Sequence, residues 1–332
     1  MKPVRLLSLL LAMLAAACSP DDEGLFVPDF EVYALLPVEG LGDRSFNDVV
    51  YEGIETARKD FPFRIKYIIP DNLAAGEEWI ARIPELKSTA ALPILIIIAG
   101  NQYRNGVEKL EGQYGTCKIL LLAVAASEHS GLASVTYRTF APSYLGGYLS
   151  AGLVPNCRAI VVQAFDAPFL REFRDGFEQG VTDAGGLVNS PVYIANGFEG
   201  FSMSDSAYNL TRTLLPDNDL IYALGDGSNF GIINAARDYG EPRYVIGVDA
   251  DQSWMGFSVV TGSVVILYGL EIYEYISGFS AGLFTPGHFT RTMADGKTSF
   301  LINKFVLGGI TVPDTLISMA VEKEKVYIPP GK

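Results

Sequence analysis

The sequence contains few of the residues that most often bind metals or form cross-links. Three cysteines and two histidines occur in 332 residues. Three cysteines cannot build a framework of several disulfides, and two histidines nearly exclude a metal centre with several histidine ligands. We therefore expect neither a metal site nor another cofactor.

Basic residues are also scarce. Lys and Arg number 25 against 38 Asp and Glu, and the formal net charge is −13. Binding to a phosphate backbone normally needs clustered basic charge, so we expect no nucleic-acid partner. Hydrophobic residues make up 49% and charged residues 19% of the chain, which excludes a disordered protein. The length predicts two domains.

The N-terminus has the pattern of an export signal. Lys2 and Arg5 precede an apolar stretch, residues 6–14, which is too short to span a bilayer as a helix. Three alanines then lead to Cys18. This pattern predicts a signal peptide over residues 1–17. A cysteine directly after the cleavage site resembles the lipobox of bacterial lipoproteins, whose thiol is acylated. The alternative is a secreted protein with an incidental cysteine.

The segment that follows the signal peptide is acidic and contains proline. We interpret residues 18–29 as a tether between the lipid and the globular part. Removal of residues 1–17 takes away Lys2 and Arg5, so the mature chain carries −15 over 315 residues. No later run reaches 18 apolar residues, so no other membrane span is expected. The prediction is a globular protein anchored to a bacterial membrane, in the periplasm or outside the cell.

The rest of the chain alternates strand and helix patterns. Short, solidly apolar runs are typical of parallel strands covered on both faces, and the amphipathic stretches 46–60 and 169–184 predict helices. The alternation occurs twice, which predicts an α/β protein of two doubly wound lobes, with a ligand crevice at the carboxyl ends of the strands. The expected strands are 30–36, 65–69, 94–99, 118–124, 134–137, 159–163, 187–193, 219–224 and 244–248.

Two loops that follow expected strands combine glycine with aromatic residues. In loop 41–47, Ser45 can cap the next helix, and Phe46 and Asn47 stand at its start. An aromatic ring beside an amide suits a flat, hydrogen-bonding ligand, although a ring packed under its own helix is the alternative. Loop 225–231, Gly-Asp-Gly-Ser-Asn-Phe-Gly, either lets a ligand approach the backbone or makes a tight turn. It matches neither the Walker nor the dinucleotide motif.

Two other loops carry carboxylates. Asp249 and Asp251 follow the strand expected at 244–248. Such a pair can ligate a metal, act as acid and base, or accept hydrogen bonds from two ligand hydroxyls. A metal has too few companion ligands here and catalysis has no nearby nucleophile, whereas an ionised carboxylate accepts hydrogen bonds strongly. Helix capping is the alternative, and it is also the role expected of Asp166, beside Pro168.

The assembled motifs resemble the basic membrane protein family of bacterial solute-binding lipoproteins, which includes a purine-nucleoside-binding group. Their order and spacing hold from about residue 30 to 280. The matching motifs are Asp-Arg-Ser-Phe-Asn at 43–47 with Glu-Gly at 52–53, Tyr-Leu-Gly-Gly at 144–147, the series Asp166, Pro168, Phe173, Gly176, Phe177, Gly180 and Val181, and Ile-Gly-Val-Asp-Ala-Asp-Gln at 246–252.

The resemblance implies a type I periplasmic-binding-protein fold whose hinge has three crossovers. In such relatives a purine stacks between two aromatic rings, and an Asp holds the ribose hydroxyls. Carried over to this sequence, the stacking pair is Phe46 and Tyr222, and the ribose ligand is Asp249. Gly227 then lies near the sugar, and the candidates for the base edge are Asp43 and Asn47.

This sequence departs from the family pattern on the ribose side. The family carries a Lys in a Ser-x-x-Lys-Arg helix after the third crossover, but the aligned residues 263–267 contain none. The glycine loop, Gly-Gly-Thr-Gly-Leu-Gly in the family, has Asp226 and Asn229 instead. The Glu that precedes the Tyr-Leu motif is also replaced, by Ala141 or its neighbour. The ligand is therefore a purine nucleoside, a free base or another flat, polar molecule.

These observations predict a lipid-anchored, monomeric solute-binding protein that serves an ABC permease and is not an enzyme. The alternative is a surface lipoprotein that uses the same fold for sensing or adhesion. We expect an N-terminal lobe from residues 30–137 and 256–294 and a C-terminal lobe from 138–255 and 295–328. Cys117 and Cys157 fall in different lobes, where a disulfide would hinder closure, so free thiols are expected.

Overall fold

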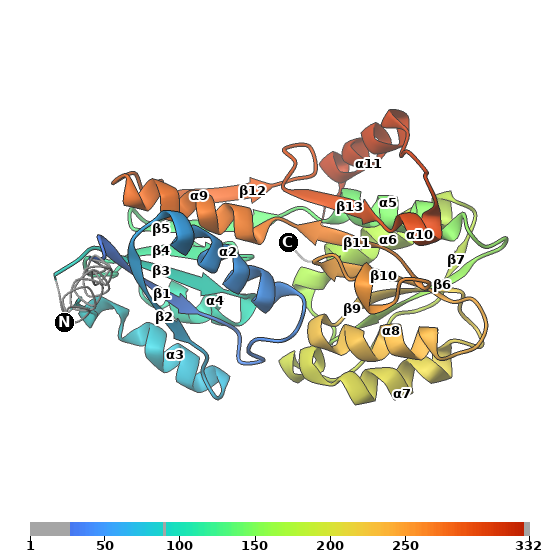
Figure 1. Cartoon of the computed structure of the whole chain (residues 1–332), viewed down its shortest axis with the longest axis horizontal. Helices are drawn as coiled ribbons and strands as arrows, with labels where there is room; N and C mark the ends of the chain where they lie inside the picture. Colours follow the sequence, from blue (N-terminus) through green and yellow to red (C-terminus); the bar gives the residue numbers. More distant parts are fainter. Residues whose placement is uncertain (1–26, 89–90, 329–332) are drawn as a thin grey trace, which may run out of the picture.

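A computed structural model describes residues 27–88 and 91–328 as two α/β lobes joined by three connections (Figure 1). The expected signal peptide 1–17, Cys18 and the tether up to residue 26 lie outside the described residues. In the described part of the chain, no helix combines the length and the apolar character needed to cross a membrane.

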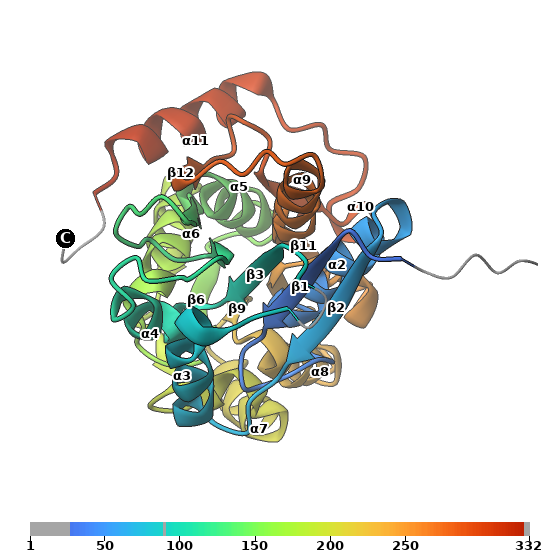
Figure 2. The same cartoon turned by 90° about the vertical axis from the view of Figure 1, so that its left-hand side faces the viewer.

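The N-terminal lobe is built on a parallel sheet of six strands, in the order β12-β5-β4-β3-β1-β2. Helices α2 (Phe46–Asp60) and α9 (Tyr268–Ser280) cover one face, and α3 (Leu73–Ala81) and α4 (Arg104–Glu108) cover the other, as Figure 2 shows from the side of this lobe. The strands are β1 (Phe30–Leu35), β2 (Phe63–Ile68), β3 (Ile94–Ala99), β4 (Lys118–Leu122), β5 (Leu132–Tyr137) and β12 (Gly287–Arg291).

The C-terminal lobe is built on a second sheet, in the order β13-β11-β10-β9-β6-β7, and β8 also pairs with β6. All its pairs are parallel except the antiparallel pair β11–β13. The strands are β6 (Arg158–Gln163), β7 (Leu187–Val188), β8 (Val192–Tyr193), β9 (Leu220–Leu224), β10 (Tyr244–Asp249), β11 (Val260–Ile266) and β13 (Thr298–Ile302).

Helices cover both faces of this second sheet as well. Buried residues of α7 and α8 pack in one cluster with β6, β9 and β10, whereas α6 packs on the opposite face and α5 packs with α11. The expected α/β fold of two doubly wound lobes is confirmed. The helices are α5 (Phe140–Ala151), α6 (Arg171–Asp183), α7 (Ser204–Leu214), α8 (Asn229–Arg237), α10 (Lys304–Leu307) and α11 (Asp314–Val326).

Most expected elements lie within two residues of the observed ones, but three strands were not expected. These are β11, β12 and β13. The run expected as one strand at 187–193 is two short strands, β7 and β8. Cys117 and Cys157 are buried and free, and they precede strands of different lobes, as expected.

The position of β11 corrects the expected lobe boundary. β11 pairs with β10 and β13, so residues 260–266 belong to the C-terminal lobe, and assigning 256–294 to the N-terminal lobe was wrong at its start. The chain crosses between the lobes after β5, after β11 and after β12. Residues 263–266, expected in a helix, are part of this strand. Their local pattern does not reveal which sheet they join.

Candidate functional site

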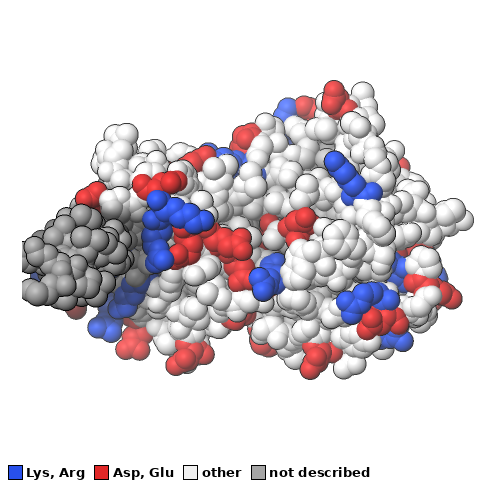
Figure 3. Space-filling model, viewed as in Figure 1, with Lys and Arg blue, Asp and Glu red and all other residues white. Residues whose placement is uncertain are grey.

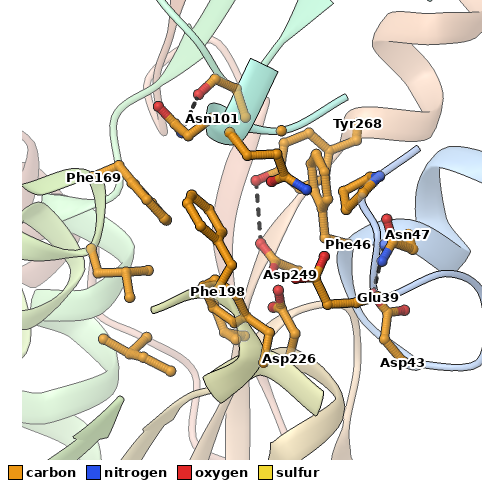
Figure 4. A pocket seen from close by; sticks show the side chains of 18 of the residues that line it. Glu39, Asp43, Phe46, Asn47, Asn101, Phe169, Phe198, Asp226, Asp249 and Tyr268 are labelled. Carbon is orange, nitrogen blue, oxygen red and sulfur yellow. Dashed lines mark hydrogen bonds between the residues drawn. The ribbon is translucent and has the colours of Figure 1, made fainter. Parts of the chain in front are cut away.

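A cavity of about 90 Å³ lies between the lobes, at the carboxyl ends of the strands (Figure 4). Its walls come from the segments that follow β1, β3, β4, β9 and β10, together with the start of α9 and the segments around Phe169 and Phe198. The crevice therefore lies where the doubly wound pattern places it. The lining residues are Pro37, Glu39, Asp43, Phe46, Asn47, Gly100, Asn101, Gln102, Ala123, Phe169, Leu170, Phe173, Phe198, Phe201, Leu224, Asp226, Val248, Asp249 and Tyr268.

Asp43 caps helix α2 at the edge of the cavity. Its carboxylate accepts hydrogen bonds from the backbone N–H groups of Ser45 (2.9 Å), Asn47 (2.8 Å) and Asp48 (3.1 Å). The positive end of the helix dipole adds to this stabilisation. Burial raises the pKa of Asp43, and the three backbone bonds oppose that shift. Its negative charge is therefore largely compensated within its own lobe.

Ser45 is the N-cap residue of α2, as expected, but its side chain makes no capping hydrogen bond and connects the two lobes instead. Its Oγ lies 3.1 Å from Asp226 Oδ1 and 3.1 Å from Asp249 Oδ2, both in the C-terminal lobe. Asp43 already satisfies the first backbone N–H groups of the helix, which leaves this hydroxyl free to reach across. Ser45 thus holds the two lobes together beside the cavity.

Asp226 and Asp249 form a close pair of carboxyl groups. Asp249 is buried and accepts hydrogen bonds from Ser45 and from the Tyr268 hydroxyl (3.2 Å). Burial raises the pKa of Asp249 above its usual value. Burial, and then repulsion from Asp249 and Asp43, raises the pKa of Asp226 well above the usual range. The two carboxyl groups hydrogen-bond to each other, which requires that the pair share one proton.

Aromatic rings line the cavity from both lobes. Phe46 packs edge-to-face on Tyr268, with ring centroids 4.8 Å apart. From the other lobe, Phe169 and Phe198 are partly exposed to the cavity, and their rings are stacked at 6.2 Å. In Figure 4 the Phe198 ring lies between Phe169 and the Asp249 side of the cavity. A flat ligand would therefore meet aromatic rings from both lobes.

Asn47 carries a polar atom that lacks a partner. The residue is 3% exposed and lines the cavity, and its Oδ1 accepts no hydrogen bond. A buried acceptor without a donor costs free energy, which a bound ligand recovers by donating to it. Asn47 is thus a residue of the cavity lining with an unused hydrogen-bond acceptor.

Of the six residues expected in the site, four line the cavity: Asp43, Phe46, Asn47 and Asp249. Tyr222 does not. It is fully buried inside the C-terminal lobe, where it packs against Phe177 and hydrogen-bonds to Ser143. The expectation that Tyr222 stacks on the ligand is therefore wrong, because its position in the middle of β9 keeps it away from the strand end.

Gly227 lies beside the cavity and brings the lobes together. A Cβ atom there would lie 3.1 Å from the backbone oxygen of Phe201 and 3.6 Å from the Asp43 Cα across the interface.

The two remaining candidate carboxylates are outside the lining of the cavity. Asp251 caps the next turn by accepting from the Ser253 N–H at 3.0 Å. Asp166 is half-exposed, 3.9 Å from Arg171.

Several lining residues were not identified from the sequence. Asp226 was noted only as a departure in the glycine loop, although an acid in a loop otherwise made of small residues is a usable signal. Tyr268, Phe169 and Phe198 gave no such signal, because each enters the cavity through the folding of a separate segment. Within residues 27–88 and 91–328, no group of three or more His, Cys, Asp or Glu side chains is arranged to hold a metal ion.

Two doubly wound lobes with a cavity at their strand ends define a periplasmic-binding-protein-like fold. The family model described as ABC transporter substrate-binding protein PnrA-like (Bmp) matches residues 30–289. The chain therefore belongs to this family of solute-binding proteins, as the sequence motifs indicate.

Individual relatives agree with this assignment at low identity. Basic membrane protein A of Borreliella burgdorferi is 22% identical over 330 residues, covering 98% of this chain and 91% of that protein. An uncharacterized lipoprotein of Pyrococcus abyssi is 22% identical over 348 residues, covering 98% and 85%.

Solved structures share the fold. The ABC transporter solute-binding protein from Aeropyrum pernix aligns with a TM-score of 0.75 at 20% identity, covering 90% of this chain and 87% of that one. A transcriptional activator of the comK gene from Bacillus halodurans aligns with a TM-score of 0.67 at 19% identity, covering 91% and 99%.

Proposed function

We propose that this chain is the lipid-anchored solute-binding component of an ABC-type importer, and that it binds a purine nucleoside or a similar flat, polar ligand between its lobes. The observation that carries the proposal is a single cavity in which aromatic rings from both lobes face buried carboxylate and amide acceptors. Such a cavity suits a ligand with a flat ring and hydrogen-bond donors. The proposal assigns no catalytic residue.

The ring of the ligand would lie between the lobes. Phe46 belongs to one lobe, and Phe169 and Phe198 belong to the other (Figure 4). Stacking of a base on an aromatic side chain contributes about 1–3 kcal/mol. We propose Phe198 or Phe169 as the second stacking ring in place of Tyr222, because these two rings are the ones exposed to the cavity.

The hydroxyl groups of the ligand would bind Asp249. Each carboxylate oxygen has two lone pairs, and the bonds from Ser45 and Tyr268 use one on each oxygen. The carboxyl group of Asp226 uses a third position, so one acceptor position remains for a ligand hydroxyl, and a second hydroxyl would have to replace the bond from Asp226. Asn47 and Asp43 lie at the N-terminal end of α2, where they can accept from the edge of a base. Gly227 keeps the interface close beside them.

Binding would involve a change in the distance between the lobes. The cavity of about 90 Å³ is smaller than the roughly 300–1,000 Å³ of typical small-molecule sites. A ligand as large as a nucleoside would therefore enter an open form and shift the population toward a closed one. The three connections between the sheets supply the hinge for this motion.

The charge of the lining argues against phosphorylated ligands. Glu39, Asp43, Asp226 and Asp249 line the cavity, and none of the lining residues is Lys, Arg or His. A phosphate group would meet carboxylates without a cation to balance it. We therefore propose a nucleoside or a free base rather than a nucleotide.

The proposed anchor is Cys18, acylated with fatty acids such as palmitate after removal of the signal peptide 1–17. One acyl chain binds a membrane only weakly, whereas two or three anchor a protein stably. The relative from Pyrococcus abyssi is named a lipoprotein, which supports this proposal. The globular part would then act as a monomer outside the cytoplasm and deliver its ligand to a membrane permease.

The competing function is a surface lipoprotein that uses the fold for sensing or adhesion. The absence of a Lys from 263–267 and the altered glycine loop favour it. The fold is not confined to transport, since a transcriptional activator shares it. A test that separates the two is binding of the natural partner by the Asp249→Ala variant, which would be unchanged if the cavity played no part.

The direct experiment is mass spectrometry of small molecules released by denaturation of the purified protein, followed by calorimetry with a panel of nucleosides and bases. The expected result is binding of at least one of them, lost in Asp249→Ala. Asp166→Ala is the matched control, because Asp166 lies in the same lobe outside the cavity lining. Binding of no nucleoside or base would reject the proposed ligand class.

A further inference from the structure

The carboxyl pair Asp226–Asp249 has no positive partner in the cavity. All four charged residues of the lining are acidic. Asp43 is compensated by three backbone N–H groups, but Asp249 receives bonds only from neutral hydroxyls and from the carboxyl group of Asp226. A buried carboxylate without a cation is costly, so the protein keeps a proton there when no ligand is bound.

Other lining groups also suit a positive charge. Asn47 is 97% buried, and its Oδ1 accepts no hydrogen bond from the protein. This unused acceptor suits a ligand that donates hydrogen bonds. Aromatic faces attract cations through their quadrupole, and rings such as Phe46, Phe198 and Tyr268 line the same space. These two features are independent of the carboxyl pair.

The surface near the cavity carries charges of both signs. Figure 3 shows Asp and Glu side chains over α2 and beside the junction of the lobes, with Lys and Arg side chains next to them. Asp48 of α2 pairs with Arg44, and Glu55 pairs with Arg58. A preference for a cation therefore comes from the cavity and not from the outer surface. In the described part of the chain no cluster is arranged for a metal ion, so an organic cation fits better.

We propose that the ligand is a flat-ring molecule that carries a positive charge, and that Asp226 and Asp249 are its counter-ion. Asp226 is then the residue that determines this charge specificity. On binding, the ligand cation replaces the proton held by the pair, and that proton passes to solvent. The inference rests on the proposed solute-binding function and specifies the charge of the ligand.

The test uses three probes of the same shape: benzamidine, which is a cation, benzamide, which is neutral, and benzoate, which is an anion. Their binding to the full mature chain is measured by calorimetry at pH 7.5. The expected order is benzamidine first, by about tenfold or more over benzamide, with no detectable benzoate binding. Adenosine and 1-methyladenosine, which is cationic, form a second matched pair with the same expected preference.

Variants identify the residue responsible. Asp226→Asn keeps the shape and removes the charge, so benzamidine should lose about tenfold in affinity while benzamide is unchanged. Asp166→Asn is the control, and it should alter neither. Repeating the titration in buffers of different ionisation enthalpy should reveal release of a proton with benzamidine and not with benzamide. Thermal unfolding of each variant verifies that it is folded.

The outcomes separate this inference from the proposed function. Binding of neutral adenosine as tight as that of 1-methyladenosine, or of benzamide as tight as that of benzamidine, overturns the charge preference and leaves nucleoside binding intact. Preference for the cationic probes without binding of any nucleoside supports the charge preference and rejects the nucleoside. If no probe and no nucleoside binds, both proposals fail.

Discussion

The contact between helices α2 and α9 allows a test that requires no ligand. Gly53 of α2 packs against Gly269 of α9 so closely that a Cβ atom on Gly53 would lie 2.5 Å from the Gly269 Cα and 3.0 Å from its carbonyl oxygen. Ordinary carbon contacts are about 3.5–4.0 Å. In Gly53→Ala the two helices must therefore move apart by roughly 1 Å.

The expected cost follows from this geometry. Overpacking typically costs about 1–3 kcal/mol, and a backbone neighbour that cannot rotate away places this site at the upper end. Alanine regains about 1 kcal/mol through its higher helix propensity. The net loss of about 2 kcal/mol should lower the Tm by roughly 3 °C for a chain of this size.

A second glycine supplies a control in which the same substitution is expected not to lower the Tm. A Cβ on Gly152, at the end of α5, would make only an ordinary contact, 3.4 Å from the Leu149 oxygen. Gly152→Ala should therefore keep or raise the Tm. Differential scanning calorimetry of both variants measures the difference. A Gly53→Ala protein at least as stable as the wild type would refute the argument from close packing.

Three further predictions concern the carboxyl pair, the interface and the thiols. The pKa of Asp226 is higher in the folded state than in the unfolded state, where it is near 4. The folded state therefore holds an extra proton, and stability falls as the pH rises from about 4 toward the folded-state pKa. Asp226→Asn should consequently raise the Tm at pH 7.5, with the gain disappearing near pH 4 in a series of melts, and an equal gain at every pH would contradict this. Ser45→Ala removes the hydroxyl that bridges the lobes and should enlarge the radius of gyration in small-angle X-ray scattering. Ser150→Ala, which breaks a bond within one lobe, should leave it unchanged. Burial raises the pKa of Cys117 and of Cys157 to about 11, so a thiol reagent at pH 8 should react with them only after denaturation, and rapid reaction of the native protein would argue against their burial.

The local pattern was sufficient for most of the parallel strands before residue 250 and for the helix that carries Phe46 and Asn47. Apolar runs such as 94–99 have the composition of strands covered on both faces, and the structure contains β3 at Ile94–Ala99. The same pattern was insufficient for β12 and β13, which alternate exposed and covered residues at the sheet edges. Edge strands have weak apolar runs because one side is left to solvent.

The residues of the site also fall into those that the local sequence pattern could place and those that it could not. The loops after β1 and β10 could be placed at the crevice because the carboxyl ends of parallel strands meet at one edge of a sheet. Tyr222 shows the limit of this reasoning. It precedes the glycine loop by only a few residues, yet its place inside β9 turns its ring into the core.

The sequence by itself determined the class of the fold, the family and the position of Asp249 and Phe46, because these depend on local periodicity and on motifs of consecutive residues. The tertiary structure alone decided that β11 belongs to the C-terminal lobe and that the side chain of Asp43, rather than that of Ser45, accepts the capping hydrogen bonds of α2. It also decided that Asp226 meets Asp249 without a cation beside them. The physical reason is that burial and charge compensation depend on neighbours far apart in the chain, which no local pattern specifies.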